Sequence, residues 1–327
     1  MILVRAPLRI SFVGGGSDLP AYLAGGAPGH VVSATIAESA YVTVQPSHDG
    51  RTRLHYQHVE DVARAHELQH DRAREALAHA GVAGGVELHS IADLPAGSGL
   101  GSSSAFTVAL LAALAAHQGR HLPAETLARA ACRVEMHQCG HPIGYQDAYA
   151  SAYGGLNSFT FHQGGTVLRE RLSVPQGLET RLSLVPVGGC HDASQILRTQ
   201  GEAPRIGPMT LASLAQDFEL AIRACDLDAA GAILGDAWHV KKRLAPGITA
   251  PHIDALVAQA YAAGAQGVKL CGAGGAGYLL VWAPATGLTA ALPGQRPVRL
   301  HEHGARVVWR PETHQPVLAS RFAGGPL

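Results

Sequence analysis

The sequence predicts an α+β protein built from two domains. Its 327 residues exceed the usual size of a single hydrophobic core. Apolar residues make up 47% of the chain and charged residues 15%, a composition typical of a folded globular protein and not of a disordered one. Segments rich in β-branched residues alternate with segments of helical periodicity, without an internal repeat. We therefore expect both strands and helices in each half.

The first half carries the clearest strand signals. Residues 2 to 13 alternate and are β-branched, with Pro7 as a break, so they predict two short strands or one interrupted strand. Residues 30 to 46 favour a hairpin or paired strands. Helical spacing predicts an exposed amphipathic helix over 62–80, which would suit an interface, and another helix over 123–138. Shorter strands are expected at residues 86–91, 157–161 and 166–170.

A new series of strands and helices begins near Pro175. We place the domain boundary there and expect domains 1–178 and 179–327. A strand is expected at 181–187. The remaining helices are expected at residues 211–224, 227–244 and 251–263, and the remaining strands at 267–271, 278–282, 297–300 and 305–309.

Charge and hydropathy exclude several classes of partner. Twenty-five basic and 25 acidic residues cancel, so neither nucleic acid nor a membrane surface is indicated. The N-terminus does not resemble a signal peptide, and the longest apolar run, 105–116, is too short to span a bilayer. We expect a cytoplasmic protein, and the sequence leaves a homodimer open.

Cysteine and histidine give weaker signals. Five cysteines at scattered spacings, without a CxxC pair, predict reduced and mostly buried thiols. Among 19 histidines, four pairs have spacings that a metal could use, but a zinc site needs a third ligand, which the sequence does not identify. The pairs are His55/His58, His66/His70, His137/His141 and His301/His303.

The stretch 93–116 is the most informative part of the chain. Its three glycines at alternate positions, Gly97, Gly99 and Gly101, allow backbone conformations closed to other residues and a close approach by a ligand. A serine-rich helix start follows, and helix N-termini bind anions. The stretch therefore predicts a phosphate-binding loop, although Ser102 to Ser104 could also do no more than cap the helix.

A second glycine cluster lies at 272–277. It matches GxGxxG, but a dinucleotide-binding motif should open a helix, whereas the residues that follow this cluster predict a strand. Turn glycines are the simpler alternative. A P-loop lysine, the protein-kinase motifs and a GxSxG nucleophile elbow are all absent from the sequence, which weakens hydrolase and dehydrogenase interpretations.

Phosphoryl transfer needs a phosphate cradle, an oxygen ligand for Mg²⁺ and a carboxylate near the acceptor hydroxyl. Ser102 or Ser103 could hold the metal from the loop, and Glu135 could face it from the following helix. Asp147 could meet the acceptor hydroxyl. Taken singly, Glu135 is more often a solvated helix residue and Asp147 a local cap, so the combination carries the hypothesis.

Three segments together resemble the motifs of the GHMP small-molecule kinases: RAPLRISFVGGGSDLPAY, PAGSGLGSSSA and KLCGAGGAGYLL, in that order. The first segment and AWHVKKRLAPGI are most similar to D-glycero-D-manno-heptose 7-phosphate kinases. The resemblance implies a two-domain fold, with a ribosomal protein S5 domain 2-like N-terminal domain and a ferredoxin-like C-terminal domain. It also implies ATP and Mg²⁺ as cofactors and a sugar or sugar phosphate as the substrate.

The resemblance also implies a role for each matching residue. Asp147 would act as the base or orient the sugar hydroxyl, with Arg9 beside it favouring its ionised form. Ser102, Ser103 and Glu135 would hold the metal. The ATP phosphates would lie on Pro95, Gly97, Ser98, Gly99, Leu100, Gly101, Ser102, Ser103 and Ser104. The sugar would contact Gly15, Gly16, Ser17, Asp18, Tyr145, Gln146, His191, Gly272, Gly274 and Gly275.

Two departures from the heptose kinases concern the substrate. Tyr145 and His191 stand where those kinases have a lysine and an arginine, so a sugar phosphate would be held differently or a less charged sugar used. Fucose-like, galactose-like and unphosphorylated heptose acceptors therefore stay open. A non-catalytic sugar-binding regulator and a hydrolase built on the serine-rich loop are the alternatives from other classes.

Overall fold

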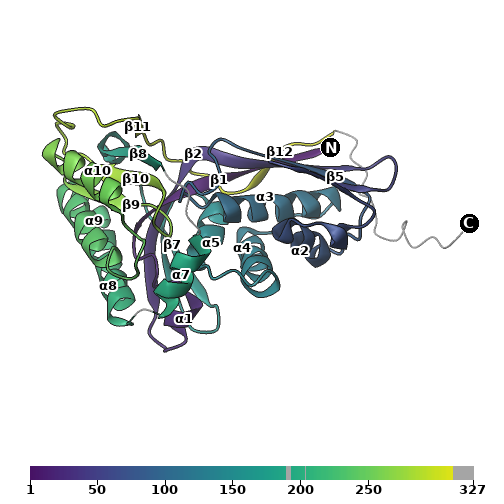
Figure 1. Cartoon of the computed structure of the whole chain (residues 1–327), viewed down its shortest axis with the longest axis horizontal. Helices are drawn as coiled ribbons and strands as arrows, with labels where there is room; N and C mark the ends of the chain where they lie inside the picture. Colours follow the sequence, from purple (N-terminus) through teal and green to yellow (C-terminus); the bar gives the residue numbers. More distant parts are fainter. Residues whose placement is uncertain (189–192, 203, 312–327) are drawn as a thin grey trace, which may run out of the picture.

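The computed structural model describes residues 1–188, 193–202 and 204–311, which form two β-sheets with helices packed against them (Figure 1). The larger sheet has eight strands in the order β12-β1-β2-β5-β3-β4, with β6 paired to β2 and β7 to β6. Its strands are β1 (Ile2–Val13), β2 (Gly29–Pro46), β3 (Thr52–His55), β4 (Val59–Val62), β5 (Val86–Ala92), β6 (Leu156–Phe161), β7 (Val167–Arg171) and β12 (Arg306–Trp309).

Two long antiparallel strands, β1 and β2, form the centre of this sheet. β1 is one strand whose register shifts between Pro7 and Arg9, as expected for an interrupted strand. The prediction of a hairpin over 30–46 is wrong, because these residues form one 18-residue strand. Its second half pairs with β5 and its first half with β6, so the small residues in its middle mark a change of neighbour and not a turn.

Helices α2 to α5 lie on one side of strands β1, β2 and β5 (Figure 1). The predicted helix over 62–80 is wrong for its first half, where β4 ends at Val62 and a short 3₁₀ turn precedes α2. The other predicted helix, 123–138, is an α-helix that continues as a π-helix. The elements are α1 (Pro20–Leu23), η1 (Ala65–Glu67), α2 (Asp71–His79), α3 (Ser102–His117), α4 (Ala124–Cys132), η2 (Arg133–Gln138) and α5 (Gln146–Tyr153).

The second half forms the smaller sheet, whose four strands have the order β11-β8-β10-β9. Helices α9 and α10 pack against it at one end of the molecule, and α8 packs between α9 and strands β1 and β2 (Figure 1). The elements are α6 (Leu178–Arg181), β8 (Leu182–Gly188), α7 (Ala193–Glu202), α8 (Ile206–Arg223), α9 (Leu227–Lys241), α10 (Pro251–Ala262), β9 (Gly267–Leu270), β10 (Gly277–Trp282) and β11 (Arg296–Pro297). As predicted, a strand and not a helix follows the glycine cluster at 272–277.

Aromatic packing joins β1 to the second half of the chain. The ring of Phe12 stacks on Phe218 of α8 at 5.2 Å between centroids, and Trp282 of β10 meets both rings edge-on. All three side chains are fully buried. The last described strand, β12, returns to the larger sheet beside β1. We propose a domain boundary at 178 because the second sheet begins just after it, although β12 of the second half belongs to the larger sheet.

None of the described helices is long and apolar enough to cross a bilayer. The described cysteines are free thiols, as expected, but only Cys132 and Cys271 are buried, while Cys139 is partly exposed and Cys225 is exposed.

Candidate active site

The phosphate-loop candidate runs from Pro95 into α3 through three left-handed glycines. Gly97, Gly99 and Gly101 have φ angles of +79°, +74° and +75°, a region that disfavours residues with a Cβ. Helix α3 begins directly after Gly101, and no side chain caps its N-terminus. The serine-cap interpretation is therefore not what the structure shows, and the amide groups of the first turn have no side-chain cap, as at helix ends that can bind anions.

Arg9 and Asp147 form a bidentate ion pair. Nε of Arg9 donates to Oδ1 of Asp147 at 2.7 Å, and Nη2 donates to Oδ2 at 2.6 Å. The third guanidinium nitrogen, Nη1, donates to the carbonyl of Gly99 at 2.8 Å. Arg9 is buried on β1 and Asp147 lies in the first turn of α5, so the Arg9 side chain links the strand, the glycine loop at 97–101 and the carboxylate. Paired, planar hydrogen bonds of this kind fix the orientation of a carboxylate.

The buried carboxylate of Asp18 is hydrogen-bonded to Gln146, the first residue of α5, which directly precedes Asp147. Oδ2 of Asp18 accepts from the amide of Gln146 at 3.1 Å, and its Oδ1 accepts from the amide of Gly16 at 3.0 Å. Burial raises the pKa of Asp18, which the two amides oppose and the Asp147 carboxylate reinforces. A Cβ at Gly144 would lie 1.9 Å from Oδ2 of Asp18, so this close packing requires glycine.

Glu135 is completely buried in the π-helix η2. Its Oε1 accepts from Nε of Arg72 at 2.8 Å, and its Oε2 accepts from Oγ of Ser104 at 2.7 Å. Ser102, Ser103 and Ser104 all line the adjacent cavity, but the hydrogen bond to Glu135 comes from Ser104 and not from the predicted Ser102 or Ser103. Single π-turns are rare and often occur at functional sites, which is consistent with a carboxylate displaced from a regular helical face.

Two buried lysines bond to backbone carbonyls near the site, and one of them links the two halves of the chain. Nζ of Lys241 donates to the carbonyls of Leu270, at 3.0 Å, and Gly272. Nζ of Lys269 donates to the carbonyls of Ser11 at 2.6 Å and Phe12 at 2.8 Å, both on β1. Burial lowers the pKa of Lys241 to about 8 and that of Lys269 well below its usual range.

The two glycine loops touch each other. A Cβ at Gly99 would lie 2.7 Å from the carbonyl oxygen of Cys271, and one at Gly272 would lie 2.5 Å from the Cα of Gly99. A Cβ at Gly277 would meet the carbonyl oxygen of Ser98 at 2.4 Å. Glycine is required here for backbone-to-backbone contact, so the cluster at 272–277 packs against the glycine loop at 97–101.

These elements enclose a cavity of about 320 Å³. Most of the predicted site residues line it. They are Arg9, Gly15, Gly16, Asp18, Gly97, Gly99, Gly101, Ser102, Ser103, Ser104, Gln146, Asp147, Gly272 and Gly274. Seven other predicted residues do not line it: Pro95, Ser98, Leu100, Ser17, Glu135, Tyr145 and Gly275. The Tyr145 ring instead stacks beside Phe161 at 6.0 Å. His191 lies outside the described residues.

The cavity is also lined by basic residues that the sequence did not predict for this site, notably Arg72, His141, Lys241 and Lys269. Arg72 was missed because it lies in the exposed helix predicted over 62–80, where a charged residue normally faces solvent. His141 was noted only as a possible metal ligand, because of its spacing from His137. The KK pair at 241–242 and the lysine before the glycine cluster were inside resemblance motifs. Nothing in their spacing revealed that Lys241 and Lys269 are buried.

Comparison with known proteins places this fold and site in a family. Residues 64–155 match the GHMP kinases N terminal domain, and residues 218–291 match the GHMP kinases C terminal domain. The two matches together cover about half of the chain and follow each other in the family's order. The chain belongs to the GHMP kinase family.

Two relatives are similar over most of this chain. A D-glycero-alpha-D-manno-heptose 7-phosphate kinase of Campylobacter jejuni is 25% identical over 87% of this chain and 90% of its own length. A bifunctional fucokinase/GDP-fucose pyrophosphorylase of Arabidopsis thaliana is 28% identical over 86% of this chain, which spans only 30% of that larger protein.

Solved structures agree with this family. A D-glycero-D-manno-heptose 1-phosphate kinase from Bacteroides thetaiotaomicron superposes with a TM-score of 0.74 at 25% identity, covering 95% of this chain and 99% of that one. A Lactococcus lactis galactokinase complexed with galactose has a TM-score of 0.75 at 15% identity, covering 93% and 94%. The second similarity shows the fold alone.

Proposed function

We propose that this protein is an ATP-dependent kinase that phosphorylates the anomeric (C1) hydroxyl of a heptose 7-phosphate for nucleotide-activated heptose synthesis. D-glycero-D-manno-heptose 7-phosphate is the first candidate substrate. The observation that carries the proposal is the Arg9–Asp147 pair, which presents an oriented carboxylate to a cavity bounded by the phosphate loop. The names of the Campylobacter and Bacteroides relatives support the choice of sugar.

Asp147 can act on the acceptor although both its oxygens already accept from Arg9, because each carboxylate oxygen offers a second lone pair. In the proposed step Asp147 orients the C1 hydroxyl and takes its proton. The sugar oxygen then bonds to the γ-phosphorus of ATP while the bond to the bridging oxygen breaks, and ADP leaves. Such transition states are loose, so positioning contributes more than proton removal.

The loop 95–104 is proposed to hold the phosphates through its backbone amides and the start of α3. Buried Glu135 and the hydroxyls of Ser102, Ser103 and Ser104 are hard oxygen donors of the kind Mg²⁺ prefers, so the residues fit that ion. Magnesium, when bound, neutralises charge on the phosphate oxygens. Glu135 is paired with Arg72 in this structure, so we expect Arg72 to release it when the metal binds.

The cavity can still accommodate a sugar phosphate, although Tyr145 and His191 stand where the heptose kinases have a lysine and an arginine. Arg72, His141 and Lys241 place positive or protonatable groups along the same cavity. These side chains can offset the charge of a sugar phosphate near the site. They do not select a heptose over another phosphorylated sugar.

The test is an ADP-release screen over heptoses and hexoses, each with and without a terminal phosphate, with the product position determined by ³¹P NMR. We expect turnover with a heptose 7-phosphate and a product phosphorylated at C1. Turnover with only fucose or galactose would contradict the proposed heptose substrate but would support the proposed kinase activity. No ADP release with any sugar would favour the non-catalytic regulator.

A further inference from the structure

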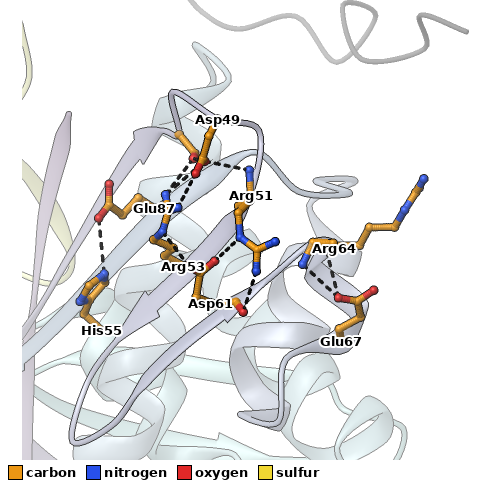
Figure 2. Close-up of polar contacts among 10 residues, drawn as sticks. Asp49, Arg51, Arg53, His55, Asp61, Arg64, Glu67 and Glu87 are labelled. Carbon is orange, nitrogen blue, oxygen red and sulfur yellow. Dashed lines mark hydrogen bonds and ion pairs between the residues drawn. The ribbon is translucent and has the colours of Figure 1, made fainter. Parts of the chain in front are cut away.

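A cluster of two histidines and one glutamate lies on the larger sheet, outside the lining of the candidate active site. His55 ends β3, and Glu87 and His89 lie on β5. Each residue offers one ligand atom, and the three atoms lie within 4.8 Å of one another. The polar side chains of this region, including His55 and Glu87, are drawn in Figure 2.

Strand pairing holds the two histidines together. β3 and β5 are parallel neighbours, and His55 lies directly opposite His89 in their register. The two imidazole rings consequently stack, with centroids 4.3 Å apart and an interplanar angle of 16°. Because both side chains come from paired strands of one sheet, little conformational entropy remains to be lost when they share a ligand.

Both rings direct a nitrogen toward the same carboxylate oxygen. Nε2 of His55 lies 3.4 Å from Oε1 of Glu87, and Nε2 of His89 lies 3.6 Å from it. A tetrahedral zinc ion with bonds of about 2.0–2.1 Å separates its ligand atoms by about 3.4 Å. The two separations are therefore close to those of a zinc site. They are longer than a good hydrogen bond, and Nε2 of His55 is buried without a hydrogen-bond partner among the described residues.

The surroundings also support a cation. Nε2 of Gln45, on β2, donates to the other carboxylate oxygen of Glu87 at 3.0 Å, which orients the carboxylate as outer-shell partners of metal ligands do. Arg53 lies nearby, but its guanidinium is paired with Asp49 and Asp61, so its charge is offset (Figure 2). Two neutral imidazoles and one carboxylate suit a divalent transition metal.

We propose that His55, Glu87 and His89 bind zinc or a similar divalent transition-metal ion that joins β3 to β5. A water molecule completes the coordination, as at other sites with three protein ligands. The ion fastens the β3–β4 hairpin, which forms one edge of the sheet, to β5. This site is separate from the proposed Mg²⁺ site and does not depend on the proposed kinase activity.

The test is calorimetric titration of Zn²⁺ into the metal-free full chain, purified without a polyhistidine tag and in the absence of nucleotide. The Cys139→Ser background removes a second three-residue group, Asp71, Cys139 and His141. We expect one saturable site, weakened at least about 10-fold by His89→Ala or by the near-isosteric Glu87→Gln. Gln45→Ala should weaken it about 10-fold by freeing the carboxylate.

His48→Ala is the matched control, because His48 is an exposed histidine close in sequence but outside the cluster. It should leave the affinity unchanged. Co²⁺ should give the absorption of a tetrahedral site without a thiolate charge-transfer band, and metal should raise the melting temperature of the background protein but not of His89→Ala. Unchanged affinity and stoichiometry in both His89→Ala and Glu87→Gln would overturn the proposal, as would binding that disappears with Cys139→Ser.

Discussion

At the scale of single residues, the account depends on Arg9. Its guanidinium donates to both oxygens of Asp147 and to the Gly99 carbonyl at once, so it fixes the carboxylate and the glycine loop at 97–101 relative to each other. A lysine offers a compact point charge in place of this planar fork. The exchange keeps the positive charge but cannot keep all three contacts.

We therefore expect Arg9→Lys to lower kcat/KM by about 10-fold or more, which corresponds to about 1.4 kcal/mol of lost transition-state stabilisation. The measurement is steady-state ADP release with the best sugar from the screen. Arg5→Lys is the control on the same strand, since Arg5 bonds to Ser39 and Ala37 and does not line the cavity. Equal losses in both variants would contradict a specific role for Arg9.

At the scale of elements, the site is formed where two glycine loops meet. The proposed phosphate loop precedes α3, and the loop between β9 and β10 contacts it. The two backbones meet directly at Gly99 and Gly272. This contact explains why glycines recur in both motifs and why the second cluster need not bind a dinucleotide.

Gly99→Ala should force the two loops apart, because its Cβ would lie 2.7 Å from the Cys271 carbonyl oxygen. Gly97 has nearly the same φ angle, but a Cβ there meets nothing within 4 Å, so Gly97→Ala is the matched control. Both variants carry the left-handed backbone cost of about 1–2 kcal/mol. We expect urea unfolding to show a larger loss for Gly99→Ala; equal losses would mean that the loops do not touch.

At the scale of the whole molecule, the sequence could predict the α+β class, most elements and, through the three motifs, the residues around Arg9 and Asp147. It could not predict the long-range contacts. The hairpin expected over 30–46 is one strand because it changes partner midway, which no local pattern encodes. His55 was paired by spacing with His58, whereas its actual neighbour is His89 on a parallel strand.

The free energy of unfolding should depend on pH because of Lys241, which links α9 to the start of the glycine cluster at 272–277. Burial lowers its pKa to about 8, whereas an unfolded lysine titrates near about 10.4. Between these values the unfolded chain binds more protons, so the free energy of unfolding rises with pH. Below the lower value both states are protonated and this dependence disappears.

The comparison is between the wild type and Lys241→Met in chemical unfolding at several pH values. The wild type should gain about 1–2 kcal/mol relative to the variant from about pH 7.5 to about pH 9.5. Subtracting the variant removes the contribution of other groups that titrate in this range. A difference that stays flat or falls with pH would mean that Lys241 is not buried as a charged group.

The most direct test of the central claim is the activity and ATP affinity of Asp147→Asn. The change keeps the size of the side chain and one oxygen that can accept from Arg9, but it replaces the other oxygen with a donor amide group and removes the proton acceptor. We predict that kcat falls by about 100-fold or more while ATP still binds with wild-type affinity. Full turnover in Asp147→Asn would contradict the proposed mechanism.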